Sequence, residues 1–137
     1  MSECKPTPAA PEDPQATSQR DLRPGDICAQ QVDYLPIFKA IADELDLVGV
    51  VDRLVSTEMH VSCGLIVLGL VLDTLSGRSP LYRLVEFFDG RDTEVLLGQS
   101  VPATVFNDHT VGRVLDKLYE TGTQKIYSEL AMTALHA

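Results

Sequence analysis

The most apolar stretch of the chain runs from Val61 to Leu75, with the sequence VSCGLIVLGLVLDTL. At helical spacing its Leu, Ile and Val side chains surround the axis, and such a helix is either buried by neighbours or placed in a membrane. The apolar run is about a dozen residues, which is too short to span a bilayer. The pattern therefore predicts a buried central helix, with Ser62 as N-cap and Gly77 as C′ residue. Gly64 and Gly69 are expected to be points of close packing inside this helix.

Two shorter apolar patterns precede this helix. One helical face, at spacing i, i+3, i+4 and i+7, consists of Phe38, Ile41, Ala42 and Leu45. Pro36 suits the first turn of that helix, and the pattern repeats over residues 47–55. We expect Asp33 or Asp46 to cap these two helices.

Two further patterns follow the central helix. Ser79 and Pro80 predict the N-cap and first residue of a helix that Gly90 ends. A short helix is expected between Asp92 as cap and Gly98 as stop. Its buried face is predicted to be Val95, Leu96 and Leu97. The segment 99–106 is predicted to be a loop, with one helical turn after Pro102.

The C-terminal part carries the best-formed pattern. A helix is predicted from the cap Asn107 to the stop Gly122, with Asp108 favourable for the helix dipole. Its apolar stripe is Val111, Val114, Leu115, Leu118 and Tyr119. A last helix is expected from Thr123, and its inward residues are predicted to be Ile126, Tyr127, Leu130, Ala131, Ala134 and Leu135. No convincing strand pattern occurs, so the predicted fold is all-α, a compact bundle of about six to seven helices over residues 26–137.

The first 25 residues have a different composition. Prolines occur at Pro6, Pro8, Pro11, Pro14 and Pro24. Between them lie small and polar residues that cannot form a core, so residues 1–25 are predicted to be a disordered leader. No apolar segment of the kind found in signal peptides is present. The three cysteines, Cys4, Cys28 and Cys63, show no metal-binding spacing. A cytoplasmic location is expected.

Candidate catalytic groups do not converge in the sequence. The carboxylates considered for a two-metal site are Asp73, Asp89, Asp92, Asp108, Asp116 and Glu120. Three of them fall at predicted helix ends, and the others, Asp73 among them, fall on predicted polar faces. A two-metal site needs carboxylates that converge on the same metal ions. The histidines, His60, His109 and His136, are far apart. We expect no enzymatic activity, no metal, no cofactor and no small-molecule substrate.

The overall charge restricts nucleic-acid binding to a local surface. The net charge is −9, with a sequence pI of about 4.6, and phosphate binding depends on clustered Lys and Arg. Arg78 and Arg83 flank a predicted turn, and Arg113 and Lys117 are one helical turn apart, so these four are the candidate DNA-binding residues. The alternative is a solvated face with salt bridges, because acidic residues lie beside Arg113 and Lys117 on the same helix.

The segment from Tyr34 to Met132 resembles the N-terminal domain, catalogued as of unknown function, of one group of DDE-type insertion-sequence transposases. The blocks that carry the resemblance are LPIFKAIADELDLVGVVDRLV, VSCGLIVLGLVLDTLSGRSPLYRLVEFF, EVLLGQSVPATVFND and FNDHTVGRVLDKLYETG. In those transposases the helical domain precedes a catalytic domain with three metal-binding carboxylates, and Thr133–Ala137 supplies none of them.

The resemblance implies a non-catalytic domain or fragment that assists transposon-end DNA binding or transposase assembly. Its expected partners are transposon-end DNA, a second copy of the chain or a catalytic transposase chain, and no membrane. The alternative function is a helical protein–protein interaction or dimerisation module with no role on DNA.

Overall fold

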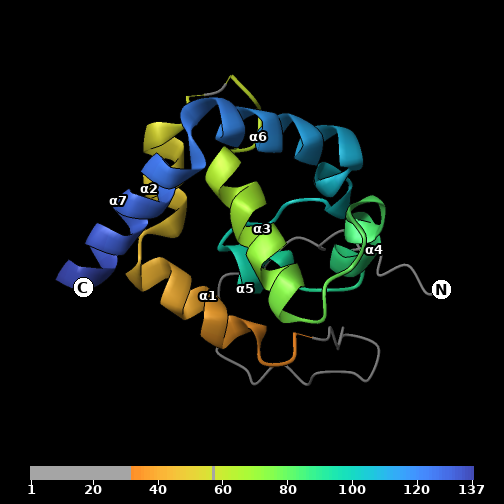
Figure 1. Cartoon of the computed structure of the whole chain (residues 1–137). Helices are drawn as coiled ribbons and strands as arrows, with labels where there is room; N and C mark the ends of the chain where they lie inside the picture. The colour runs from red at the N-terminus through yellow and green to blue at the C-terminus, as the bar shows by residue number, and fades with distance from the viewer. Residues whose placement is uncertain (1–31, 57) are drawn as a thin grey trace, which may run out of the picture. The chain divides into compact units, whose positions relative to one another are not determined.

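In the computed structural model of the protein, residues 32–56 and 58–137 are described. Within them the fold is all-α, as predicted, with no strand (Figure 1). The α-helices are α1 (Leu35–Glu44), α2 (Leu47–Leu54), α3 (Cys63–Leu75), α4 (Leu84–Phe88), α5 (Thr93–Leu97), α6 (Asp108–Thr121) and α7 (Thr123–His136). Two 3-10 turns are η2 (Leu81–Arg83) and η3 (Ala103–Phe106), and η3 confirms the turn predicted after Pro102. The predicted leader, its boundary at residue 26, Cys4 and Cys28 lie outside the described residues.

Helix α3 is the centre of the described fold, as its apolar pattern predicted. In Figure 1 it lies in the middle of the helices, and α1, α2, α5 and α6 all contact it. Eight of its thirteen residues are buried, whereas Val71 and Leu75 toward its C-terminal end are exposed, at 37% and 42%. Burial of this apolar surface is the main source of stability expected for such a domain.

The two glycines of α3 allow other elements to approach its backbone, as predicted. A Cβ atom added at Gly64 would lie 2.7 Å from the Cα of Val48 in α2. One added at Gly69 would lie 3.0 Å from Cζ of Phe106, whose ring stacks on that of Phe88 at a centroid distance of 4.0 Å. Larger residues at these positions would therefore push α2 or η3 away from the core.

The N-terminal end of α3 is held by two side chains. Ser62 is the N-cap, as predicted, and its hydroxyl accepts a hydrogen bond from the backbone N–H of Leu65 at 3.1 Å. Asp52 of α2 accepts a second one from the N–H of Gly64 at 2.7 Å. A carboxylate is favourable here because the first N–H groups of a helix lack internal partners and carry positive partial charge. Asp52 thus connects α2 to α3.

The C-terminal end of α3 corrects the predicted position of Asp73. Gly77 is the C′ residue, as predicted, with φ of +116°, and the N–H of Arg78 donates to the carbonyl of Asp73 at 2.9 Å. The Asp73 side chain was predicted on a polar face, but the residue is only 3% exposed. Its two carboxylate oxygens accept from the N–H of Ser79 at 3.1 and 3.0 Å. The carboxylate is buried because it holds the turn that folds back over the end of α3.

Three predicted caps need correction. Helix α1 has Tyr34 at its N-cap rather than Asp33, without a side-chain cap hydrogen bond. Asp46 does occupy the N-cap position of α2, but its side chain makes no cap hydrogen bond and its φ is +49°. Pro80 is itself the N-cap of η2, so Ser79 is not a cap. A 3-10 turn therefore starts the segment that was predicted to be one α-helix up to Gly90.

The caps of α5 and α6 are confirmed. Asp92 accepts from the N–H of Val95 at 3.1 Å, and Asn107 accepts from the N–H of Thr110 at 2.8 Å. Gly98 and Gly122 follow the last residues of these two helices, both with positive φ. Local capping chemistry was thus sufficient to place these boundaries.

Several residues predicted to face inward are exposed. These are Ile41, Val71, Val95, Leu115, Tyr119, Tyr127, Ala134 and Leu135. In α7 only Ile126 is fully buried. Periodicity shows which side of a helix is apolar, but a residue on that side is buried only where another element packs against it. The elements that pack against α6 and α7 cover only part of the apolar side of each helix.

Candidate functional site

The four basic residues predicted to bind DNA do not line one common depression. Arg113 and Lys117 line a depression on α6, together with Met59. Arg78 lines a second one with Leu115. Since Leu115 is two residues from Arg113, the two side chains leave α6 on opposite sides. Arg83 lines a third depression.

The Arg113 and Lys117 depression is more acidic than basic. Its other charged residues are Glu58, Asp116 and Glu120, so three carboxylates surround two cations. Lys117 donates to Glu120 at 2.8 Å, and this hydrogen bond raises the pKa of the Lys117 ammonium. This ion pair agrees with the alternative interpretation, in which Lys117 belongs to a solvated helix face with salt bridges. Such exposed pairs contribute little to stability.

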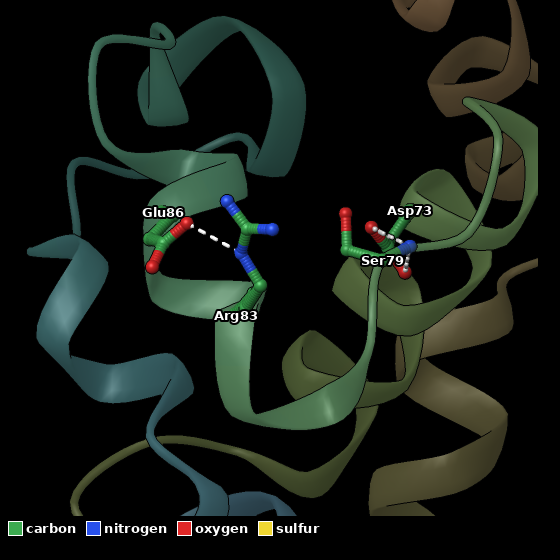
Figure 2. A network of polar contacts seen from close by, with 4 residues as sticks. All are labelled: Asp73, Ser79, Arg83 and Glu86. Atoms are coloured by element: carbon green, nitrogen blue, oxygen red, sulfur yellow. Dashed lines mark hydrogen bonds and ion pairs between the residues drawn. The ribbon is translucent and has the colours of Figure 1, made fainter.

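Arg83 lies at the start of α4 in the third depression. Its Nε donates to Glu86 at 2.8 Å, and this hydrogen bond raises the pKa of the guanidinium. Figure 2 shows the guanidinium between Glu86 and Ser79, with no bond drawn to its two terminal nitrogens. Both side chains of the pair are more than half exposed, at 56% and 63%. Arg83 therefore keeps donors available to a ligand.

Arg91 lines the same depression and was missed at the level of the sequence. Its guanidinium carbon lies 4.1 Å from the centroid of the Phe87 ring, and Nη1 donates to the Phe87 carbonyl. Its Nε is buried and has no hydrogen-bond partner among the described residues. The spacing of Arg83, Phe87 and Arg91 at i, i+4 and i+8 would place all three on one side of a continuous helix. The sequence did not predict this grouping, because the helix was expected to end at Gly90, before Arg91.

The outer face of α7 is a second feature that the sequence did not indicate. Tyr127 and Leu135 are 74% and 78% exposed, and Ala131 lies between them in the same i, i+4 row. The charged residues Lys125 and Glu129 fall on another side of the helix. The row is therefore apolar and uncharged, with two exposed large side chains on either side of the partly buried Ala131.

Two further observations concern the described residues only. Within residues 32–56 and 58–137, no three His, Cys, Asp or Glu side chains are grouped so that they could hold a metal ion. In the same part of the chain, every helix is too short or too polar to cross a membrane.

One family model matches this chain. It is described as a domain of unknown function, DUF4277, and it covers residues 27–132. The matched region includes every helix from α1 to α6 and most of α7. No curated protein and no solved structure matches the chain.

Proposed function

The chain belongs to the family of the domain of unknown function DUF4277, and we propose that it is a non-catalytic transposase domain or fragment that assembles through α7 with a second copy of itself. The transposase part is supported by the resemblance of residues 34–132 to the N-terminal domain of insertion-sequence transposases. The assembly part is supported by one observation, the apolar row of α7, in which Tyr127 and Leu135 are exposed and Ala131 between them is partly buried.

The α7 row has a shape suited to pairing with itself. Residues at i, i+4 and i+8 form a ridge along a helix, and ridges of one helix fit grooves of another. Along this ridge a small side chain, Ala131, lies between two large ones, Tyr127 and Leu135. In an antiparallel pair centred on Ala131, Tyr127 of each copy would lie against Leu135 of the other. Such a two-fold contact uses the same residues on both sides and closes as a dimer.

The expected affinity of this contact is modest. Burial of a Tyr or Leu side chain contributes roughly 1.5–3 kcal/mol, so four such side chains give roughly 6–12 kcal/mol. Association itself costs roughly 4–15 kcal/mol in lost freedom. Only the largest gain combined with the smallest cost leaves a surplus of about 8 kcal/mol, so the α7 row alone supports a dimer no tighter than micromolar.

Sedimentation of the full chain over a concentration series tests this assembly. We expect a dimer at about 100 μM that Tyr127→Glu converts to monomer, because the contact would bury two added carboxylates. Tyr82→Glu is a matched control, since Tyr82 in η2 and Tyr127 are both 74% exposed. A wild-type chain that stays monomeric, or a Tyr82→Glu variant that dissociates equally, would exclude α7 as the contact.

Contact with transposon-end DNA is a second candidate function. Two of the four predicted residues, Arg78 and Arg113, form no ion pair within the described residues, so their guanidinium groups are available for phosphate. The acidic groups around Arg113 act against this contact. DNA binding by Arg78, Arg83, Arg113 and Lys117 therefore stays a prediction, and its test is given in the Discussion.

A further inference from the structure

We infer that the depression between the C-terminal turn of α3 and helix α4 binds a phosphoryl group. It is lined by Ser76, Ser79, Pro80, Arg83, Glu86, Phe87 and Arg91. Its volume is about 370 Å³, which is within the range of small-ligand sites. This inference does not depend on the assembly role of α7, because none of these residues belongs to that helix.

The first donor group is the guanidinium of Arg83. Only its Nε is engaged, by the exposed carboxylate of Glu86, and its terminal nitrogens have no hydrogen-bond partner within the described residues. Guanidinium groups present their N–H donors in a planar fork that matches the oxygens of a phosphate. Arg83 can therefore bind an oxyanion while it keeps its bond to Glu86.

The second donor group is the guanidinium of Arg91, and its position is more constrained. It stacks on the Phe87 ring and donates through Nη1 to the Phe87 carbonyl, so its plane is fixed. The buried Nε–H lacks an acceptor among the described residues. A buried donor without a partner is destabilising, and a bound anion or water is a common explanation for one. Nη2 is the nitrogen of Arg91 that is neither buried nor hydrogen-bonded within the described residues, so it is the donor available to an acceptor in the depression.

The wall opposite the arginines consists of two serines on a rigid turn. Ser76 is the C-cap of α3, and Ser79 is held by its N–H bonds to the buried Asp73 carboxylate (Figure 2). Neither hydroxyl makes a hydrogen bond to the described residues, so both can donate to an incoming oxygen. Because the turn is fixed by Asp73, these donors are positioned before any ligand binds.

The charge of the site favours a phosphate dianion over a carboxylate. Among the described residues, Glu86 is the only acidic one that lines the depression, against the two cations Arg83 and Arg91. A phosphate monoester carries close to two negative charges near neutral pH and three oxygens that accept hydrogen bonds. It can therefore engage both guanidinium groups at once, whereas a single carboxylate has two oxygens. A small phosphorylated molecule supplies this dianion, whereas the diester of a nucleic-acid backbone offers similar oxygens with a single negative charge.

Nuclear magnetic resonance of the full chain titrated with inorganic phosphate tests the site. We expect the Nε–H signals of Arg83 and Arg91 to shift and saturate, while the Arg113 signal stays unchanged. Arg83→Gln and Arg91→Lys should each weaken phosphate binding about ten-fold, because each removes charge-assisted hydrogen bonds. Arg83 is exposed, so its substitution leaves the fold intact even if a change at the stacked Arg91 does not.

Controls and competitors make the result decisive. Arg113→Gln is the matched control, since it removes an arginine from a different depression. Displacement of phosphate by a short DNA duplex would identify a backbone phosphate as the ligand. Tighter binding of a nucleoside monophosphate, without displacement by the duplex, would identify a small phosphorylated molecule. The inference would be overturned by shifts that do not saturate, by equal shifts in sodium chloride at the same ionic strength, or by an unchanged phosphate affinity in Arg83→Gln.

Discussion

Single carboxylates fix both ends of the central helix α3. Asp73 folds the following turn onto the C-terminal end, and Asp52 joins α2 to the N-terminal end. The sequence explained Asp73 as a residue of a polar face, because a carboxylate between apolar residues is usually exposed. Its actual partner, the N–H of Ser79, lies six residues further along the chain and beyond the end of the helix. The helical periodicity of α3 therefore cannot predict this hydrogen bond. Contacts of this kind decide which polar residues are structural.

Loss of the Asp73 carboxylate should destabilise the protein. In Asp73→Ala the N–H of Ser79 loses both hydrogen bonds, and a buried polar group left without a partner costs about 1–3 kcal/mol. Asp73→Asn retains one carbonyl oxygen and should lose less. Urea denaturation followed by circular dichroism gives the free energy of unfolding for both variants.

The exposed Asp116 provides the control for this experiment. Asp116→Ala should change the free energy of unfolding by less than about 0.5 kcal/mol, as for most surface substitutions. Equal stability of Asp73→Ala and Asp116→Ala would show that the turn does not need the buried carboxylate.

Asp52 should contribute through the N-terminal end of α3. Asp52→Ala removes the acceptor for the N–H of Gly64, and losses at helix N-termini are about 0.5–2 kcal/mol. Ser62→Ala removes the neighbouring cap bond and should have an effect of similar size. Thermal melts of the two single variants and the double variant measure these effects. A melting temperature of Asp52→Ala equal to that of wild type would contradict the role given to Asp52.

At the scale of elements, local chemistry predicted most helices but not which of their faces are covered. The α3 sequence is apolar on all sides, and its composition predicted the burial of most of its residues, although Val71 and Leu75 are exposed. The caps of α5 and α6 followed from side chains next to each helix start. By contrast, the outer row of α7 is as apolar as a core face, and only the arrangement of α2 and α6 around α7 shows that its two large side chains are exposed.

A charge inside α3 should abolish the fold. Leu68 is 1% exposed, and Leu68→Asp would bury a carboxylate without a partner. The cost of several kcal/mol is a large part of the 5–15 kcal/mol typical of a domain. Leu72→Asp, and Val114→Asp in α6, should behave in the same way. Calorimetry should show no cooperative transition for these variants.

Substitution of an exposed apolar residue separates burial from hydrophobicity in that experiment. Tyr82 in η2 is large but 74% exposed, so Tyr82→Asp should keep a cooperative transition close to that of wild type. A Leu68→Asp variant that melts within a few degrees of wild type would mean that α3 is not buried in solution.

At the scale of the whole molecule, charge and its distribution decide whether DNA can bind. The sequence provided the net charge of −9 and the basic residues. It could not show that Arg78, Arg83 and the Arg113–Lys117 pair line three separate depressions, because their separation depends on how α3, α4 and α6 pack. Nor could it show Arg91 beside Arg83, since a glycine interrupts the helical spacing between them.

Binding to transposon-end DNA should therefore be weak and strongly dependent on salt. Neutralisation of a few phosphates gives a slope of log affinity against log salt of roughly −2 to −4. The double variant Arg113→Ala, Lys117→Ala should weaken binding to all sequences and reduce the slope by roughly 2, because phosphate contacts carry no base information. The melting temperature should hardly change, since both side chains are exposed and the Lys117–Glu120 pair contributes little.

Fluorescence anisotropy with labelled terminal repeats, from about 50 mM salt upwards, measures this slope. Lys125→Ala in α7 removes a positive charge outside all three depressions and serves as the control for net charge. If the double variant binds as well as wild type while Arg78→Ala and Arg83→Ala weaken binding, the contact lies at the C-terminal end of α3. If wild type shows no binding at the lowest salt, the basic residues have no role on DNA, and the apolar row of α7 is left to account for the function through assembly alone.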